Sequence, residues 1–346
     1  MVDDNFYLEL AIKEAWKTQC QTLPNPAVGA LILDHNGRIL ALQAHQEAGK
    51  PHAEVLALKE AYFNLTQDSN ILPLEQSIQI HEYLKQKAHS LFHNATLYVT
   101  LEPCMHEGKT PSCAALLESL GIKKLIIGTK DPNPKAQGGA EYLQQRGCKI
   151  IKAWENKELQ KSSILANDLL LPFNSLQKKG NFILFKYACR LNGSINGGQI
   201  SSKETQIFMH NLRCKLDELV ISGKSVLIDN PILDSRFNSL QSQKNPNITI
   251  LTRKNDFPQT APLFSIPNRQ VRILHSIPNF SGFIMCEGGI NLLQNLLPQI
   301  DMLLVFLSPT LSTYDLAPHF NANFKLLHSQ PIRNDLALWL LPKKEC

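Results

Sequence analysis

Three short segments of this chain contain residue types that bind zinc: His52-Ala53-Glu54, Pro103-Cys104 and Thr110-Pro111-Ser112-Cys113. Together they offer one imidazole and two thiolates, which occupy three of the four positions of a tetrahedral zinc ion. Structural zinc sites close with a fourth protein ligand, whereas catalytic sites leave that position for water. We therefore predict a catalytic zinc ion held by His52, Cys104 and Cys113, in a fold that brings these distant segments together.

Glu54 follows the predicted histidine ligand by two residues. Side chains two positions apart point to different sides of a helix, so both can serve one metal only beyond the helix end. Pro51 is suited to the first turn of a helix, so a helix is expected to begin near His52. Pro111 likewise indicates that a helix begins near Cys113, and we expect both helix N-termini to face the metal. Zinc lowers the pKa of bound water from about 15.7 to about 7. Glu54 is predicted to take the proton of that water and to deliver it to a departing amine.

The combination of His-x-Glu, Pro-Cys and a second cysteine is typical of zinc deaminases that act on nucleobases. In this chain eight residues separate Cys104 from Cys113, where the usual signature has two. The alternative interpretation is structural: a core histidine, a carboxylate at a helix start and two buried thiols. The spacing of all the residues together favours the catalytic interpretation.

Length and composition set further limits. With 346 residues, 43% of them hydrophobic, two domains are expected. The net charge of +5 suits a phosphate-bearing substrate but is too small to indicate an anionic partner by itself. The eight cysteines show no regular disulfide spacing, and the chain has neither a basic, apolar leader nor about 18 consecutive apolar residues. We expect a cytoplasmic protein without a membrane partner.

The first part of the chain alternates between helix and strand patterns. Helices are predicted at 6–18, 51–62, 112–120 and 139–146, and strands at 27–33, 39–44, 96–101, 125–127 and 150–151. Asn36-Gly37 predicts a tight hairpin turn between the first two strands. This alternation predicts an α/β layered domain with a partly parallel sheet, covering residues 1–153.

Residues 64–93 interrupt this pattern as an insertion. Five apolar residues indicate an amphipathic helix that docks on the domain: Leu74, Ile78, Leu84, Ala88 and Leu91. His81, His89 and His93 have no Cys or carboxylate at metal-binding spacing, so we predict that they lie on a solvated helix face.

A connecting helix and a polar linker are predicted at 154–180, followed by a second domain at 181–346. Its predicted strands are 182–188, 219–222, 247–252, 271–274, 283–286 and 302–307, and its predicted helices are 203–216 and 290–297.

Longer motifs in the first domain resemble one family of enzymes. They are Pro24-Asn25-Pro26-Ala27-Val28-Gly29, His45 with Ala48-Gly49, Pro51-His52-Ala53-Glu54-Val55, Leu101-Glu102-Pro103-Cys104 through Cys113, and Asp131-Pro132-Asn133-Pro134. This pattern resembles the bifunctional riboflavin biosynthesis deaminase/reductase. The resemblance implies a cytidine-deaminase-like α/β/α domain followed by a dihydrofolate-reductase-like α/β domain. In the loop between the cysteines, Ser112 replaces a proline of the family.

For the first domain, the resemblance implies deamination of a diaminopyrimidinone that carries a phosphoribosylamino group. Zinc is then the cofactor and Glu54 the acid and base. Four residues would line the substrate pocket: Asn25, His45, His106 and Lys109. Chemistry agrees for two of them, since the Asn25 amide can bind a pyrimidine edge and the Lys109 ammonium a phosphate. Their alternatives are a turn beside Pro24 and an exposed loop lysine.

The second domain resembles the family's reductase. The matching positions include Phe185-Lys186, Asn192-Gly193, Arg213, Ser225 to Leu233, Arg236 and Glu287-Gly288-Gly289. The resemblance implies that Lys186 lies nearest the reacting ribose, that Arg213, Leu233, Arg236 and Glu287 contact substrate, and that Ser225, Asp229 and Gly289 contact NADPH. Glycines between a buried strand and an apolar helix also suit a phosphate at the helix start, although an ordinary turn has the same pattern.

The second domain also departs from the family. Arg190-Leu191-Asn192-Gly193 replaces Ser-Leu-Asp-Gly, and residues 194–200 form a shorter stretch without the usual tryptophan. One alternative is therefore a deaminase whose degenerate reductase domain serves as a dimer scaffold. A second alternative is a deaminase that edits nucleic acid, but basic residues in 181–346 are scattered, without a basic stripe interleaved with aromatic residues. We expect a homo-oligomer, dimer or tetramer, with a small-molecule substrate and no nucleic-acid partner.

Overall fold

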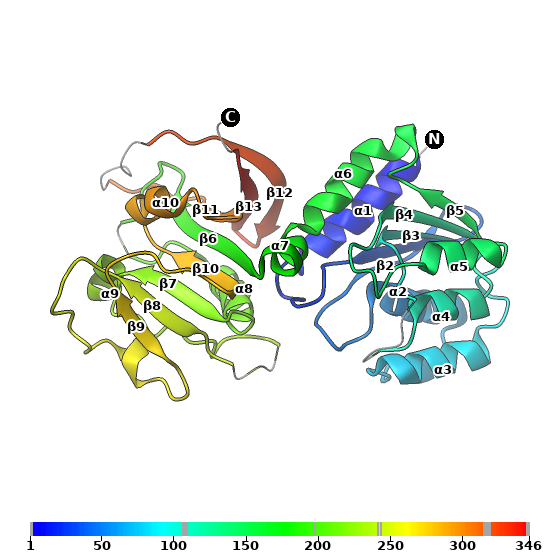
Figure 1. Cartoon of the computed structure of the whole chain (residues 1–346). Helices are drawn as coiled ribbons and strands as arrows, with labels where there is room; N and C mark the ends of the chain where they lie inside the picture. The colour runs from blue at the N-terminus through cyan, green and yellow to red at the C-terminus, as the bar shows by residue number, and fades with distance from the viewer. Residues whose placement is uncertain are drawn as a thin grey trace. The chain divides into compact units, whose positions relative to one another are not determined.

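The computed structural model describes residues 3–105, 110–196, 198–240, 242, 244–313 and 320–343. The chain forms two compact units, Met1–Asn174 and Ser175–Cys346 (Figure 1). Within the described ranges, no helix combines the length and the apolar character that crossing a membrane requires.

A sheet of five strands forms the centre of the first unit. The strands are β1 Gly29–Leu33, β2 Ile39–Ala44, β3 Thr96–Leu101, β4 Lys124–Thr129 and β5 Lys149–Lys152, in the order β2-β1-β3-β4-β5. β1 runs antiparallel to β2 and to β3, while β3, β4 and β5 are mutually parallel. Gly37 has a φ of 83° in the predicted turn between β1 and β2. The partly parallel sheet predicted for this unit is confirmed.

Helices cover both faces of this sheet. α1 Asp4–Trp16 and α6 Gln160–Leu169 lie on one face, and α2 Ala53–Thr66, α4 Cys113–Ser119 and α5 Gly139–Gln145 lie on the other (Figure 1). Strand residues alternate between the two layers, so Ala30, Leu97 and Leu125 face the α2 side. This three-layer arrangement agrees with the predicted α/β/α fold.

The helix predicted as a connection belongs to the first unit. Ser162 on α6 donates a hydrogen bond to Asn5 on α1 at 2.6 Å, and Lys161 pairs with Glu9 at 2.8 Å. The first unit therefore extends past residue 153, to Asn174. The predicted polar linker is the helix α7 Leu171–Lys179, whose Pro172 and Phe173 are buried.

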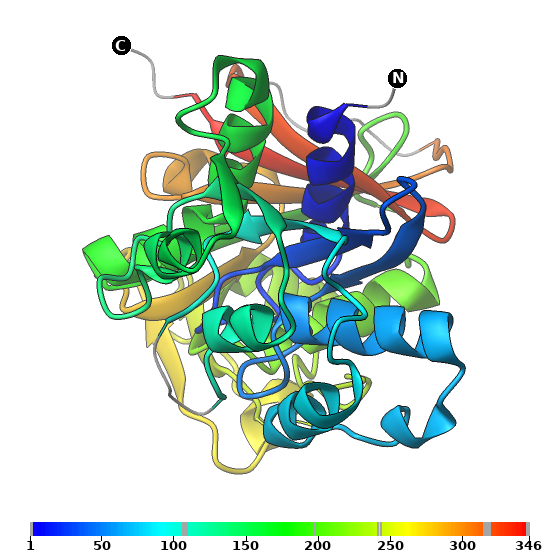
Figure 2. The same cartoon turned by 90° about the vertical axis from the view of Figure 1, so that its right-hand side faces the viewer.

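The insertion contains a short 3₁₀ helix, Ser69–Ile71, and the helix α3 Ser77–Lys87, which packs beside α2 and α4 (Figure 2). The predicted apolar face is wrong in part. Ile78 is 51% exposed and Leu91 39%, while His81 is only 2% exposed. Burial lowers the pKa of His81 to about 4, so the ring lies neutral in the core and not on a solvated face. The buried face of α3 differs from the predicted one because it contains Ile80 and His81 beside Leu84, whereas Ile78 points outward.

The second unit contains a sheet of eight strands in the order β12-β13-β11-β6-β10-β7-β8-β9. The strands are β6 Asn181–Arg190, β7 Glu218–Ser222, β8 Asn247–Leu251, β9 Val271–Leu274, β10 Gly282–Glu287, β11 Met302–Ser308, β12 Phe324–Ile332 and β13 Asp335–Pro342. Six strands, from β11 to β9 in that order, are parallel, and β13 and β12 add antiparallel pairs at one edge. The six predicted strands are the parallel ones.

Three helices of the second unit are α8 Lys203–Arg213, α9 Gly223–Asp229 and α10 Ile290–Leu296. α10 packs its leucines on one face of the sheet, and Phe208 of α8 meets Phe306 of β11 on the other at 6.0 Å. Sequence periodicity did not reveal α9, which contains β-branched residues, nor the hairpin β12–β13. β12 contains Pro331 directly after the polar run His328-Ser329-Gln330, which an edge strand tolerates but which hides the strand in the sequence.

Gly29 allows β1 and α1 to pack closely. A Cβ at this position would lie 2.0 Å from the backbone oxygen of Ala11. Because backbone atoms cannot rotate away, we expect Gly29→Ala to lower the free energy of unfolding of the first unit by about 3 kcal/mol. Denaturant unfolding of Gly29→Ala and of Lys13→Ala, an exposed position on α1, tests this expectation. Equal stability of the two variants would contradict it.

Candidate active site

The predicted zinc ligands come from three separate elements of the first unit. His52 is the N-cap residue of α2, Cys104 follows β3 by three residues, and Cys113 is the first residue of α4. His52 has an extended backbone (φ −70°, ψ 164°), so its side chain projects beyond the start of the helix. The structure therefore brings together the residues predicted to share one metal.

The distances between these side chains fit zinc. The Nδ1 atom of His52 lies 3.3 Å from Sγ of Cys113 and 3.6 Å from Sγ of Cys104, and all three ligand atoms lie within 4.8 Å of one another. A tetrahedral zinc ion with bonds of about 2.3 Å to sulfur and about 2.0 Å to nitrogen separates such atoms by about 3.5 Å. One imidazole and two thiols at this spacing match the zinc donor set, with no fourth protein ligand in the described residues.

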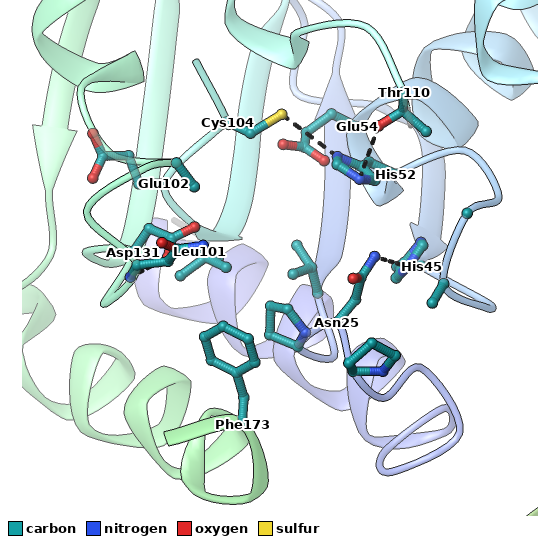
Figure 3. A pocket seen from close by; sticks show the side chains of 17 residues that line it. Asn25, His45, His52, Glu54, Leu101, Glu102, Cys104, Thr110, Asp131 and Phe173 are labelled. Carbon is teal, nitrogen blue, oxygen red and sulfur yellow. Dashed lines mark hydrogen bonds between the residues drawn. The ribbon is translucent and has the colours of Figure 1, made fainter. Parts of the chain in front are cut away.

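The surroundings of these residues lower the pKa of one thiol and raise the pKa of the neighbouring carboxyl group. The pKa of Cys104 is lowered to about 4, first by the hydrogen bond from Cys113 and further by His52. Glu54, which is 4% exposed, has a raised pKa because burial disfavours its charged form. Figure 3 shows the Glu54 carboxyl group beside the Cys104 sulfur and the His52 ring. A buried carboxyl group thus lies next to the predicted metal ligands.

Two hydroxyl groups hold the ligand segments in place. Ser112 donates a hydrogen bond to the Cys104 carbonyl at 2.9 Å and accepts one from the Ala115 amide at 3.2 Å, which caps α4. Thr110 Oγ1 lies 3.3 Å from Nε2 of His52. With a metal at Nδ1, which faces the two sulfurs, Nε2 would carry the hydrogen and donate it to Thr110. Ser112 replaces a proline of the family pattern, and its hydroxyl links the two cysteine segments directly.

A cavity of about 350 Å³ opens next to these residues. The predicted pocket residues Asn25 and His45 both line it, together with His52, Glu54 and Cys104. His45 is 2% exposed, and its Nδ1 donates to the carbonyl of Pro51 at 3.0 Å. Burial lowers the pKa of His45 to about 4, so its Nε2 is a free acceptor for the Asn25 amide at 3.2 Å. This bond fixes which side of the Asn25 amide faces the cavity (Figure 3).

Sequence reasoning did not assign several residues that line the cavity: Glu102, Thr110, Asp131, Asn133 and Phe173. Asp131 and Asn133 belong to the motif Asp131-Pro132-Asn133-Pro134, which could have indicated that they line the cavity. Phe173 lies on α7, far from any motif, and nothing in the sequence marks it. The predicted pocket residues His106 and Lys109 lie outside the described residues.

In the second unit, three of the predicted substrate residues lie together. Lys186 in β6 and Glu287 in β10 are partners in the parallel register, and Arg213 at the end of α8 binds both carboxylate oxygens of Glu287 at 3.1 and 3.3 Å. Burial raises the pKa of Glu287, but the positive charges of Arg213 and Lys186 lower it by more, so the pKa is lowered overall. Burial lowers the pKa of Lys186. The result is a partly buried cluster with an ammonium group of reduced basicity.

The other predicted substrate residues lie on the loop after α9. Leu233 is buried, with a φ of 57°, and Arg236 binds both carboxylate oxygens of Asp234 at 2.8 and 2.9 Å. Arg213 reaches the same loop through the Asp234 carbonyl at 3.5 Å. The loop is therefore connected to the Lys186–Glu287 cluster by one guanidinium group.

The predicted cofactor residues are at helix ends. Ser225 lies in the first turn of α9, where its hydroxyl contacts that of Ser222 at 2.8 Å, and Asp229 ends the same helix. Burial raises the pKa of Asp229. Gly289 is the N-cap residue of α10, as the glycine pattern predicts.

The positions that depart from the family have structural partners. The Arg190 guanidinium donates to Thr310 Oγ1 at 2.8 Å and to the Gln199 carbonyl at 3.3 Å. Asn192 donates to the Ser312 carbonyl at 2.6 Å. Both side chains therefore hold the shortened loop after β6 against the segment that follows β11.

Comparisons with known proteins agree with this geometry. Residues 1–129 match the cytidine and deoxycytidylate deaminase zinc-binding region. The chain is 30% identical over 296 residues to the riboflavin biosynthesis protein RibD of Aquifex aeolicus, covering 84% of this chain and 73% of that protein. It is 31% identical over 249 residues to RibD of Escherichia coli K12, covering 70% and 58%.

Solved structures are similar over nearly the whole chain. The diaminohydroxyphosphoribosylaminopyrimidine deaminase/5-amino-6-(5-phosphoribosylamino)uracil reductase of Thermotoga maritima matches with a TM-score of 0.61 at 26% identity, covering 98% of each chain. RibD of Acinetobacter baumannii has the same fold, with a TM-score of 0.61 at 24% identity and 99% coverage of each chain.

The Thr110 hydroxyl group orients the imidazole that faces the two sulfurs. Loss of such a hydrogen bond typically weakens metal binding 10- to 100-fold, so we expect about a tenfold weaker zinc affinity in Thr110→Val. Thr110→Ser keeps the hydroxyl and should bind zinc as the wild type does. Chelator competition titrations measure all three proteins without reference to activity. Wild-type affinity in Thr110→Val would refute the expectation.

Proposed function

Because the chain belongs to the bifunctional riboflavin biosynthesis deaminase/reductase family, we propose that it catalyses two consecutive steps of that pathway. The first unit deaminates 2,5-diamino-6-(5-phosphoribosylamino)pyrimidin-4(3H)-one with zinc. The second unit reduces the ribosyl group of the product to a ribityl chain with NADPH. The observation that carries this function is the convergence of His52, Cys104 and Cys113 beside Glu54, next to a cavity.

We propose that the cavity binds the pyrimidine ring. Asn25 is held by His45, so its remaining amide N–H and its carbonyl oxygen are directed to the ring edge. The neutral state of His45 supports this role, because a protonated ring could not accept the Asn25 hydrogen bond.

Glu54 is the proposed proton carrier of the deamination. Zinc, when bound, makes water acidic enough to ionise near neutral pH. The raised pKa of Glu54 allows its carboxyl group to accept a proton and to hold it until the amine departs. Without that proton, the leaving group would be an amide ion, which is far too basic to depart.

In the second unit, Lys186 is the proposed group nearest the ribose. NADPH supplies the hydride in this step. The partly buried ammonium group of Lys186 can donate a hydrogen bond to a ribose oxygen, and its reduced basicity favours transfer of a proton to that oxygen. Glu287 is held in place by Arg213 and is oriented to accept hydrogen bonds from ribose hydroxyl groups.

The similarity of the whole chain to a deaminase/reductase favours this function over the alternatives. A nucleic-acid-editing enzyme requires a second unit that binds nucleic acid, whereas the second unit here aligns with a reductase. The scaffold alternative is favoured by the departures at Arg190 and Asn192 and by the shorter stretch 194–200. Of these, the Arg190 and Asn192 side chains have structural partners.

We also propose that the protein acts in the cytoplasm as a homo-oligomer. Free thiols at all seven cysteines of the described residues support a reducing compartment. The edge hairpin β12–β13 exposes Leu326 (55%) and Leu336 (36%), which supports association through this edge.

Removal of the Glu54 carboxylate should stop deamination without loss of the metal. Because general acid–base catalysis contributes about 10²- to 10⁴-fold, we expect kcat of Glu54→Gln to fall about 1000-fold. Product mass spectrometry and metal analysis measure the two properties separately. Glu60→Gln changes a carboxylate on the same helix and should retain full activity. A rate for Glu54→Gln within tenfold of the wild-type rate would exclude the proposed role.

Removal of the Lys186 ammonium group should separate the two activities. We expect Lys186→Ala to form the deaminated product at the wild-type rate but to oxidise NADPH at least about 100-fold more slowly, because the proton donor is absent. Lys203→Ala, an exposed position on α8, is the matched control. NADPH absorbance with the deaminated substrate gives the measurement. No NADPH oxidation by the wild type would favour the scaffold alternative.

A further inference from the structure

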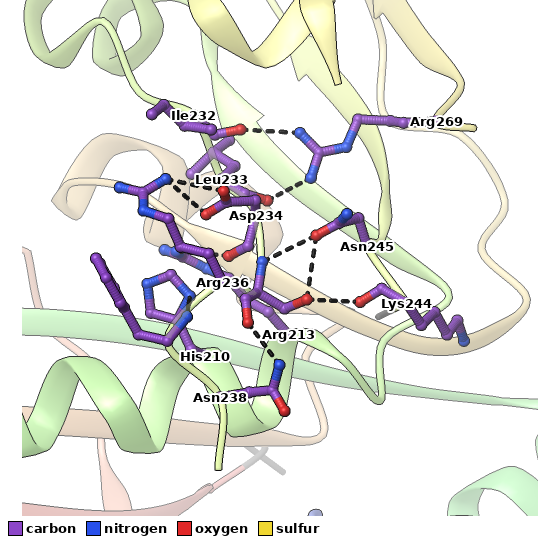
Figure 4. A network of polar contacts seen from close by, with 12 residues as sticks. His210, Arg213, Ile232, Leu233, Asp234, Arg236, Asn238, Lys244, Asn245 and Arg269 are labelled. Carbon is purple, nitrogen blue, oxygen red and sulfur yellow. Dashed lines mark hydrogen bonds and ion pairs between the residues drawn. The ribbon is translucent and has the colours of Figure 1, made fainter. Parts of the chain in front are cut away.

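The loop of residues 232–239 in the second unit has little regular structure of its own, yet it carries the proposed substrate residues Leu233 and Arg236. Side chains from other elements hold its backbone (Figure 4). Toward its end, Asn211 of α8 accepts a hydrogen bond from the Ser239 amide at 2.7 Å, and Asn245 accepts one from the Ser235 amide at 2.9 Å. The conformation of the loop is therefore set by contacts from outside it.

The start of the loop is held by Arg269, which no motif assigns to the site. Its Nη1 donates to the Ile232 carbonyl at 2.9 Å and its Nη2 to the Leu233 carbonyl at 2.5 Å (Figure 4). Arg269 lies two residues before β9, which is at the far edge of the sheet from β12. Burial lowers the pKa of Arg269 to about 10, so the guanidinium group is charged at neutral pH.

The backbone held by Arg269 has an unfavourable conformation. Leu233 has a φ of 57°, a left-handed conformation that leucine rarely adopts because its Cβ crowds the following carbonyl group. A single planar guanidinium that binds two successive carbonyl groups restrains both peptide units. Without that restraint, the segment from Ile232 to Asp234 is free to relax to a right-handed or extended conformation.

The consequences of such a relaxation reach the substrate residues. Leu233 is buried, so a change in its φ moves its side chain out of its site. Arg236 follows three residues later and is tied to Asp234, and the Asp234 carbonyl is tied to Arg213. A change at Leu233 is therefore passed on to both arginines.

We propose that Arg269 is a positioning residue of the reductase site. Its guanidinium group fixes the left-handed turn at Leu233, from which Leu233 and Arg236 are presented to the phosphoribosyl substrate. This inference rests on the proposed reductase function, since it assigns a residue to the substrate side of that site. It also predicts that Arg269 affects substrate binding more than hydride transfer.

Steady-state reduction by Arg269→Gln tests the proposal. We expect the KM for the deaminated phosphoribosyl pyrimidine to rise about tenfold, because the loop loses its preorganised conformation. The kcat and the KM for NADPH should stay within about twofold of the wild-type values. Arg269→Lys keeps the charge but lacks the planar fork, so its KM should lie between those of Arg269→Gln and the wild type.

Arg272→Gln is the matched control. Arg272 lies on β9, and its guanidinium group pairs with Glu218 at 2.6 Å and not with residues 232–239. Its KM should equal that of the wild type. A KM increase of the same size in Arg272→Gln, or an unchanged KM in folded Arg269→Gln, would overturn the proposal.

A double-mutant cycle isolates the backbone conformation. Glycine adopts a positive φ without strain, so Arg269→Gln should change the KM much less in a Leu233→Gly background than in the wild type. Equal KM changes in the two backgrounds would contradict a role through Leu233.

Amide hydrogen exchange separates this inference from the proposed function. We expect peptides that cover residues 232–236 to exchange at least about tenfold faster in Arg269→Gln than in Arg272→Gln, with or without activity. If the wild type does not oxidise NADPH, the reductase function fails, and the exchange rates alone decide whether Arg269 holds the loop. Unchanged exchange would refute the inference.

Discussion

The first unit depends on one constraint, the meeting of an imidazole and two thiols from three separate segments. His52 and Cys113 occupy the starts of two helices, and Cys104 follows a central strand of the sheet. The Ser112 hydroxyl group links the carbonyl of Cys104 to the start of α4, so protein contacts alone hold the two cysteine segments together. The close contact of α1 with β1 at Gly29 supports the sheet from its opposite face. The rest of the unit can be understood as the scaffold that holds this meeting point.

In the second unit, the side chains of the proposed site are positioned in a different way. Here parallel strands place Lys186 beside Glu287 in direct register, so the sheet itself aligns the charged groups. The loop that completes the site has no such support and depends on side chains from α8, from the segment before β8 and from Arg269. Regular secondary structure therefore positions the charges of Lys186 and Glu287, while single hydrogen bonds position the loop that carries the proposed substrate residues.

The sequence predicted much of the fold because the relevant patterns are local. The strand at 39–44, the glycine turn at Gly37 and the helix starts near His52 and Cys113 follow from alternation, turn chemistry and proline placement. His81 was misplaced because a helix can bury a polar face when a neighbouring element covers it. The edge hairpin β12–β13 was missed because edge strands need no continuous apolar pattern.

The sequence alone determined the chemistry of this protein. A histidine and two cysteines at this spacing, with a carboxylate two residues after the histidine, are compatible with few reactions, and residue types are visible without a structure. Tertiary structure alone decided which groups are neutral, which are charged and which loops are held. Three examples depend on burial or on partners distant in sequence. They are the neutral state of His45, the contact between His52 and Thr110, and the hydrogen bond from Arg269 to the Leu233 carbonyl. Such contacts form between segments that the sequence does not connect, so no local pattern records them.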